Sequence, residues 1–235
     1  MADNLEYRIL GDDMQMVEIE LEPAEGVRAE AGAMLYMEEG VEMHTGVGGL
    51  FGGIKRVFTG ENFFITTFMN EAKIRRRAGF AAPYPGKIIA LDLKQMGGSF
   101  YCQKESFLCA ARGIDIGIAF AKKIGVGLFG GEGFILQKLT GDGFAFIHAG
   151  GGVIAKTLTA GESIRLDTGC LVAFAPSVKY DIQFVGGFHN VLFGGEGVFL
   201  AKLTGPGQIF LQTLPFARLA DRILAAGGKL NNTEK

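Results

Sequence analysis

The sequence has no Trp, only 6 Pro and only 3 Cys among its 235 residues. So little proline excludes a collagen-like chain, because a triple helix needs proline as well as glycine in bulk. The three cysteines (Cys102, Cys109 and Cys170) cannot all pair, and none lies in a C-x-x-C motif. We therefore interpret them as small buried hydrophobic residues of a protein in a reducing compartment.

An excess of charge of one sign is also missing, since 23 Lys and Arg face 25 Asp and Glu, for a net charge of −2. This balance makes nucleic acid an unlikely partner, because nucleic-acid binding usually requires a basic domain or stripe. The first fourteen residues are acidic and lack the apolar run of a signal peptide or the arginines of a transit peptide. The longest stretch without charge, 203–217, is fifteen residues, whereas a membrane span needs about 20. We expect a soluble, cytoplasmic protein.

Glycine, in contrast, is abundant, with 37 residues against an average usage of about 7%. Each glycine inside a helix costs about 1 kcal/mol, which argues against a helical bundle. Many turns between short apolar runs fit this composition better, so we predict an all-β fold. Hydrophobic residues at 48% and charged residues at 20% exclude a disordered chain.

One glycine-rich pattern occurs three times. Residues 128–141 read LFGGEGFILQKLTG and residues 192–205 read LFGGEGVFLAKLTG, with eleven of fourteen positions identical. A shorter copy, LFGGIKRVFTG, spans 50–60, and an aromatic run follows each Thr-Gly pair. We predict that each copy is a strand, a tight Thr-Gly turn and a second strand that together form a hairpin.

A second element precedes each of these copies. It reads VRAEAG at 27–32 and IRLDTG at 164–169, and its middle counterpart, YCQKESFLC at 101–109, lacks the arginine and the acid. These spacings predict repeat units at about 15–79, 85–151 and 153–214. Because a unit of this size barely buries its own core, we expect one compact domain, 1–235, with a shared core and pseudo-threefold symmetry.

A helix is predicted at the end of the chain, over 215–227. Apolar residues recur there at helical spacing, with Pro215 at the first position and Gly227 beyond the last. We interpret it as a docking or capping helix, followed by a polar tail at 229–235.

Together, the VRAEAGAM segment, the repeated LFGGEG…KLTG pattern and HAGG at 148–151 resemble the altered-inheritance-of-mitochondria family. The likeness covers nearly the whole chain. It implies repeated β-sandwich or short double-stranded β-helix units similar to the tryptophan RNA-binding attenuation protein. It also implies a homo-oligomer without established catalytic activity. Eukaryotic relatives are mitochondrial, but this chain shows no presequence, so that location is not carried over.

The repeated pattern supplies the main candidate interaction surface. Phe51, Phe129 and Phe193 each lie between a Leu and two glycines, and Glu132 and Glu196 recur in two copies. The phenylalanines are either core residues at a repeated turn or a shared apolar surface for a partner subunit or a membrane. The two glutamates are expected to cap turn amides.

Charged residues suggest structural pairs more than ligand sites. Arg28 with Glu30, and Arg165 with Asp167, stand two residues apart on predicted strands and share a face, so we predict two structural ion pairs. The only basic run, KIRRR at 73–77, is interpreted as a solvated strand end, with anionic lipid or nucleic acid as the alternative.

No catalytic, cofactor or metal site is predicted. GVGLFG at 125–130 matches G-x-G-x-x-G, but a glycine-rich segment and a strand pattern follow it where a dinucleotide site needs a helix. His44, His148 and His189 lack metal-ligand spacing; comparing the repeats places His148 at the position of Thr67 and Gln212. Serine is scarce and no G-x-S-x-G occurs.

The leading hypothesis is therefore a non-enzymatic, homo-oligomeric scaffold for an unknown protein partner or a membrane-associated assembly. The alternative is a small-molecule or RNA-binding module, by analogy with the attenuation protein's fold.

Overall fold

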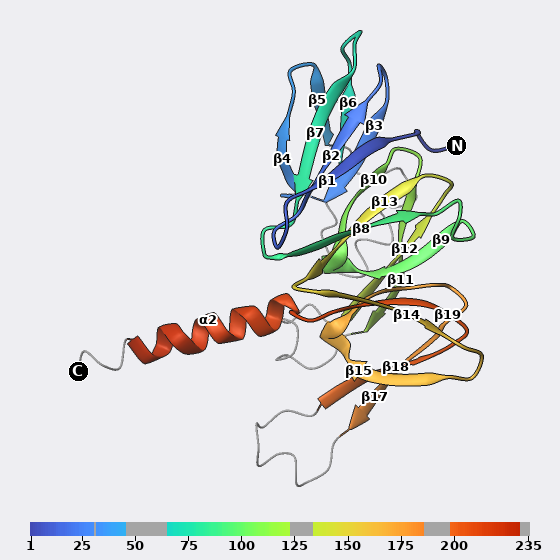
Figure 1. The fold of residues 1–235 in the computed structure, drawn as a ribbon, viewed down its shortest axis with the longest axis vertical. Helices are drawn as coiled ribbons and strands as arrows, with labels where there is room; N and C mark the ends of the chain where they lie inside the picture. Colours follow the sequence, from blue (N-terminus) through green and yellow to red (C-terminus); the bar gives the residue numbers. More distant parts are fainter. Residues whose placement is uncertain (31, 46–64, 123–133, 186–197, 231–235) are drawn as a thin grey trace.

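The structure, a computed structural model, describes residues 1–30, 32–45, 65–122, 134–185 and 198–230. These residues form antiparallel strands in four sheets, with one helix at the C-terminal end (Figure 1). The predicted all-β class with a C-terminal helix is confirmed. The threefold symmetry of the repeats stays a prediction.

The first and second sheets contain the N-terminal strands. In spatial order, the first sheet is β1 (Glu6–Leu10), β2 (Met16–Leu21), β7 (Arg76–Ala81) and β4 (Met34–Met37). The second is β5 (Val41–Thr45), β6 (Ile65–Asn70), β3 (Gly26–Glu30), β10 (Phe107–Ala111), β13 (Phe144–Gly150) and β8 (Gly86–Asp92).

The third and fourth sheets contain the remaining strands. The third is β11 (Asp115–Lys122), β12 (Phe134–Thr140), β9 (Ser99–Gln103), β16 (Leu171–Phe174), β19 (Gly207–Gln212) and β14 (Val153–Leu158). The fourth is β15 (Ser163–Asp167), β18 (Val198–Thr204) and β17 (Lys179–Val185). Two short 3-10 helices, η1 (Lys104–Ser106) and η2 (Thr168–Cys170), precede β10 and β16.

Two of the three Thr-Gly turns are corners between sheets, so the hairpin prediction is wrong for these two; the first copy, 50–60, lies outside the described residues. The turn after Thr140 joins β12 of the third sheet to β13 of the second, and the turn after Thr204 joins β18 of the fourth sheet to β19 of the third. Six of the seven residues of β13 are buried. A strand with so little exposed surface is covered on both faces. Because the chain changes sheet at the turn, β13 lies inside the second sheet and packs against the other sheets.

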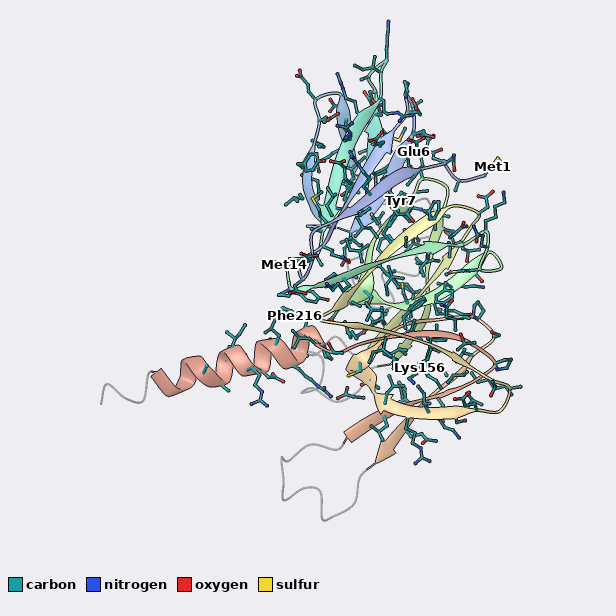
Figure 2. All side chains as sticks on the ribbon, in the orientation of Figure 1. Met1, Glu6, Tyr7, Met14, Lys156 and Phe216 are labelled. Carbon is teal, nitrogen blue, oxygen red and sulfur yellow. The ribbon has the colours of Figure 1, made fainter. Side chains whose placement is uncertain are left out.

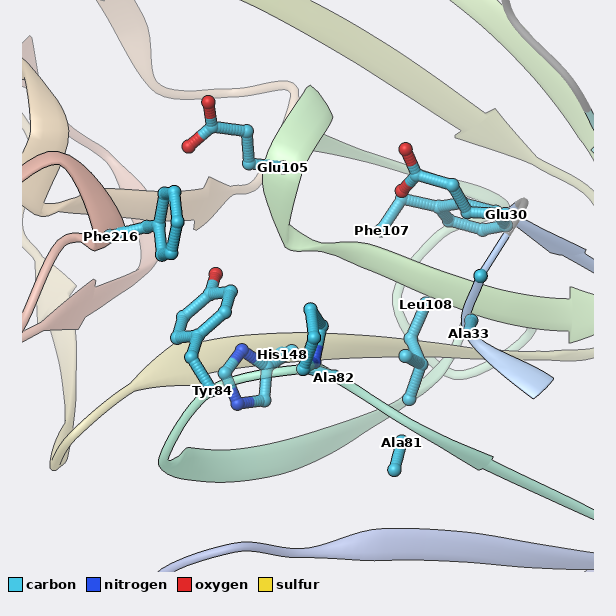
Figure 3. A pocket seen from close by; sticks show the side chains of 12 residues that line it. Glu30, Ala33, Ala81, Ala82, Tyr84, Glu105, Phe107, Leu108, His148 and Phe216 are labelled. Carbon is cyan, nitrogen blue, oxygen red and sulfur yellow. The ribbon is translucent and has the colours of Figure 1, made fainter. Parts of the chain in front are cut away.

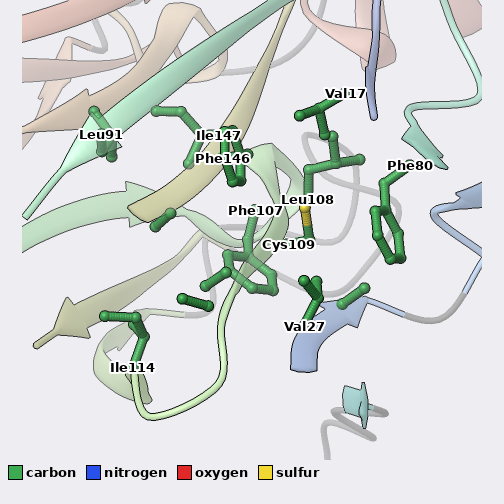
Figure 4. Close-up of a cluster of buried hydrophobic side chains, with 14 of the residues drawn as sticks. Val17, Val27, Phe80, Leu91, Phe107, Leu108, Cys109, Ile114, Phe146 and Ile147 are labelled. Carbon is green, nitrogen blue, oxygen red and sulfur yellow. The ribbon is translucent and has the colours of Figure 1, made fainter. Parts of the chain in front are cut away.

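The main core lies where these sheets face one another. Phe146 and Ile147 of β13 are fully buried beside Val17 of β2 and Phe80 of β7, in one cluster that extends to β9 and β16 (Figure 4). A smaller cluster lies between the third and fourth sheets. The chain thus shares one main core among strands far apart in the sequence.

Two of the three cysteines are buried, as the composition predicts. Cys102 and Cys109 are buried with free thiols, and Cys170 is half-buried and also free. Burial raises the pKa of both buried thiols above the usual range. At neutral pH these two side chains are protonated and pack as small apolar groups.

The helix α2 (Phe216–Leu230) is longer than predicted, because Gly227 lies inside it and does not end it. A glycine lowers helix stability by about 1 kcal/mol but does not by itself stop a helix. From Asp221 to Gly227 every residue is exposed, and the helix projects away from the sheets (Figures 1 and 2). No helix in the described ranges is long and apolar enough to cross a membrane.

Core packing can be tested at Phe80, which is fully buried and packs edge-on against Phe68 with ring centroids 5.1 Å apart. We expect Phe80→Ala to lower the free energy of unfolding in urea by about 3–5 kcal/mol, as truncation of a buried Phe does. Ile223→Ala, at an exposed position on α2, is the control and should change it by less than about 1 kcal/mol. Equal losses in the two variants would contradict this assignment of the core.

Candidate functional site

The predicted aromatic surface lies outside the described residues. This applies to Phe51, Phe129 and Phe193, and to Glu132 and Glu196. The choice between core residues and a contact surface for them stays a prediction, as does the interpretation of the glycines at 125–130.

Arg28 and Asp167, one residue of each predicted ion pair, form hydrogen bonds with other parts of the chain. Arg28 donates from Nη1 to the carbonyl oxygen of Ile114 at 2.9 Å. Asp167 accepts a hydrogen bond from Arg218 of α2 at 2.7 Å and another from the backbone N–H of Gly169 at 2.8 Å. The carboxylate of Asp167 therefore anchors the helix to β15, where the sequence predicts a bond to Arg165.

Two arginines of the basic run at 73–77, Arg75 and Arg77, pair with carboxylates of the chain. Arg75 pairs with Glu6 at 2.9 Å and with Glu20 at 3.0 Å, and it also contacts Glu22. The hydrogen bond from Arg75 lowers the pKa of Glu20. Carboxylates of the chain itself therefore surround the guanidinium of Arg75. This favours the interpretation of the run as a solvated strand end over a binding site for anionic lipid or nucleic acid.

A cavity of about 460 Å³ is the best candidate for a binding site (Figure 3). Most of its wall is apolar, and its polar side chains come from β3, the 3-10 helix η1, the segment before β8, and β13. The lining residues used below are Glu30, Tyr84, Glu105, His148, Phe216 and Ala82.

His148 is the most unusual polar residue of this cavity. Its side chain is only 2% exposed, and its Nδ1 atom has no hydrogen-bond partner. Burial lowers the pKa of His148 to about 4. The ring is therefore neutral at physiological pH, and it can donate or accept one hydrogen bond that the described chain does not supply.

One aromatic ring packs on the imidazole, and a second ring packs on the first. Tyr84 packs edge-on against His148 with ring centroids 4.6 Å apart, and Phe216 lies 5.2 Å from Tyr84. Burial, together with the charges of Glu105 and Glu30, raises the pKa of Tyr84 to about 12. Figure 3 shows the carboxylates of Glu105 and Glu30 on the side of the cavity opposite Tyr84 and His148.

The strand pairing revises the sequence comparison of His148. His148 follows Ile147, which pairs with Phe107, and Gln212 follows Leu211, which pairs with Leu171. In the first sheet, Phe80 pairs with Met34 in the same way, and Ala81 follows Phe80. The residue equivalent to His148 is therefore Ala81, and the sequence comparison with Thr67 is wrong.

Gln212 shows what a bonded side chain does at this position. It accepts from the N–H of Gly150 at 2.8 Å and donates to the carbonyl of Gly169 at 2.7 Å. The imidazole of His148 has no such bond at Nδ1. Sequence reasoning missed Tyr84 and Phe216 as its neighbours, because they are distant along the chain and carry no shared motif.

The cavity is suited to binding more than to acid–base chemistry. A neutral imidazole and a protonated phenol face a mostly apolar space at neutral pH, and both can orient a ligand through hydrogen bonds. Within the described ranges no three His, Cys, Asp or Glu side chains come together as metal ligands.

Comparison with known proteins gives the family. The family model described as "Mitochondrial biogenesis AIM24" matches residues 7–214. The chain belongs to the AIM24 family. An uncharacterized protein of Streptococcus pyogenes serotype M6 is 31% identical over 231 residues, which is 94% of this chain and 90% of that protein. An X-ray structure of a Streptococcus pyogenes protein is similar with a TM-score of 0.77 and 26% identity, covering 95% of this AIM24-family chain and 100% of the other.

The buried imidazole predicts a pH dependence of stability. An unfolded histidine has a pKa near 6.5, so between pH 6.5 and 4 the unfolded chain binds a proton that the folded chain does not. The free energy of unfolding should therefore fall as the pH drops through this window, by up to about 3 kcal/mol. Urea melts of the protein and of His148→Gln, which does not titrate, should diverge below pH 6.5. Parallel profiles would refute this.

Proposed function

We propose that this AIM24-family protein is a non-enzymatic, homo-oligomeric scaffold that holds a partner through α2. The observation that carries the proposal is the uncovered apolar face of this helix. Ile223 and Leu224 are 63% and 72% exposed, and Phe216 extends the same face to the edge of the cavity.

The first turn of α2 contacts the rest of the chain, whereas residues 221–227 are exposed. Arg218 pairs with Asp167, and Phe216 packs against Tyr84, so the first turn sets the direction of α2. Burying a large aliphatic side chain contributes about 1.5–3 kcal/mol, which gives a partner protein or a membrane surface a reason to cover Ile223 and Leu224. Asp221 and Arg222 make the opposite face polar.

Assembly can be tested by light scattering at micromolar concentration. We expect a mass that is a multiple of the 25.1 kDa protomer, because a scaffold of this kind presents several copies of α2 at once. A mass near 25.1 kDa would refute the oligomer.

The helix face can be tested separately with Ile223→Ser combined with Leu224→Ser. Both side chains are exposed, so the melting temperature should stay unchanged while sedimentation with phosphatidylcholine vesicles, or capture of a partner, is lost. Asp221→Ser combined with Arg222→Ser is the matched control, since it removes one charge of each sign from the other face. The same loss in both variants would show that the apolar face is not the contact.

A second candidate function is the binding of a small, mostly apolar molecule in the cavity beside His148. The mostly apolar wall supports it, because such a molecule loses contact with water there, and Tyr84 adds a polar group to the lining. RNA is less favoured, because carboxylates of the chain already surround Arg75.

A neutral fluorescent dye such as Nile red tests the cavity. We expect saturable fluorescence enhancement with the protein, and its loss in Ala82→Phe, whose added ring occupies the cavity. Met43→Phe, at an exposed position on β5, should bind the dye as the unmodified protein does. Equal binding by both variants would place the dye elsewhere.

A further inference from the structure

The second and third sheets are each assembled across a junction between strands from successive stretches of the chain. In the second sheet β10 pairs with β3, where Cys109 lies opposite Ala29. In the third sheet β16 pairs with β9, where Ala173 lies opposite Cys102. Each junction thus joins one strand that follows a 3-10 helix to one strand from the preceding stretch of sequence.

Strand β4 is built like β10 and β16. All three have the same irregularity against their other neighbour, a register shift between Met34 and Tyr36, between Phe107 and Cys109, and between Leu171 and Ala173. The same turn follows each strand, with the N–H of Val41, Ile114 and Val178 donating to the carbonyl three residues earlier. Yet β4 is the last strand of the first sheet, and no strand among the described residues pairs with its other side.

Strand β15 is built like β3 and β9. It pairs with β18 as β3 pairs with β6 and as β9 pairs with β12. Asp167 at its end caps η2, as Gln103 at the end of β9 precedes η1. However, β15 is the last strand of the fourth sheet, so the edge that β3 and β9 use at a junction has no partner strand in the described part of the chain.

The two unpaired edges expose apolar side chains whose counterparts are buried. Every residue of β10 and β16 is buried, whereas Leu35 and Met37 of β4 are 58% and 37% exposed. β4 has neither a proline nor a charged residue, the features that normally protect a free edge from pairing. Ile164 and Leu166 of β15 are likewise only partly buried, while Val27 and Ala29 of β3 are fully buried.

One side-chain hydrogen bond crosses the junction between β3 and β10, and the equivalent donor and acceptor are present at the edges of β15 and β4. Arg28 of β3 donates to the carbonyl of Ile114, in the turn after β10. Arg165 holds the same place in β15, as the shared motif VRAEAG and IRLDTG shows. The equivalent acceptor after β4 is the carbonyl of Val41.

We propose that β15 of one copy pairs antiparallel with β4 of a second copy, so that the contact between molecules repeats the junctions within one molecule. The register of those junctions places Leu166 opposite the second copy's Tyr36 and Arg165 opposite its Met37. The inference rests on the proposed self-assembly and specifies its surface. Because β4 and β15 lie at opposite ends of the molecule (Figure 1), one chain cannot pair them itself. Such a head-to-tail contact forms a ring if it closes and a filament if it does not.

A charge-swap series tests this contact by light scattering. Met37→Lys sets a lysine opposite Arg165 across the contact, and we expect the mass to fall to the 25.1 kDa protomer. Arg165→Glu alone loses the bond to the Val41 carbonyl and should also weaken assembly, raising the dissociation constant at least tenfold. Combining Met37→Lys with Arg165→Glu restores an attractive pair, and we expect assembly to return.

Met43→Lys is the matched control, because Met43 is a similarly exposed methionine (46%) that lies opposite Phe68 of β6 and opposite no residue of β15 in the proposed register. It should assemble normally. An oligomer that survives Met37→Lys and Arg165→Glu would overturn the edge contact and leave the proposed scaffold intact. A monomeric unmodified protein would overturn both. Should Met37→Lys fail to fold by circular dichroism, Arg165→Glu at its exposed position decides the question, and normal assembly by that variant overturns the contact.

Discussion

Backbone pairing between strands distant in the sequence is the constraint on which this structure depends. Four sheets are linked by turns that cross from one sheet to the next, so no sheet is a local unit of the chain. β10 shows the consequence most directly, since it pairs with β3 on one side and with β13 on the other, and all five of its residues are buried. Removing β10 from the second sheet would separate its two halves and open the main core at once.

This organisation explains why the fold class was predictable from the sequence and the topology was not. Abundant glycine and short apolar runs are properties of local segments, and they indicate strands correctly. A Thr-Gly turn, however, has the same local chemistry whether it closes a hairpin or turns a corner. Which of the two forms depends on how much of the following strand is buried by other sheets. For β13, nearly every residue is buried.

The candidate site was beyond sequence reasoning for a related reason. Tyr84, His148 and Phe216 meet only because β8, β13 and α2 converge, and no spacing in the sequence records that convergence. The partner of Asp167 is a similar case. Two residues on one strand suggested a pair with Arg165, but the carboxylate binds Arg218, fifty-one residues further along the chain. Side-chain direction at the end of a strand depends on what packs there.

The anchor of α2 has a consequence for regulation. Asp167 is both the last residue of β15 and the residue that holds Arg218 of the helix. In the proposed assembly, a partner on the helix would therefore be linked through one carboxylate to the strand whose free edge would bind another copy. Linkage requires this influence to be mutual: if a bound partner strengthens assembly by some factor, assembly strengthens partner binding by that same factor. In the proposed assembly, this single ion pair would couple the binding of a partner at the helix to the number of copies that assemble.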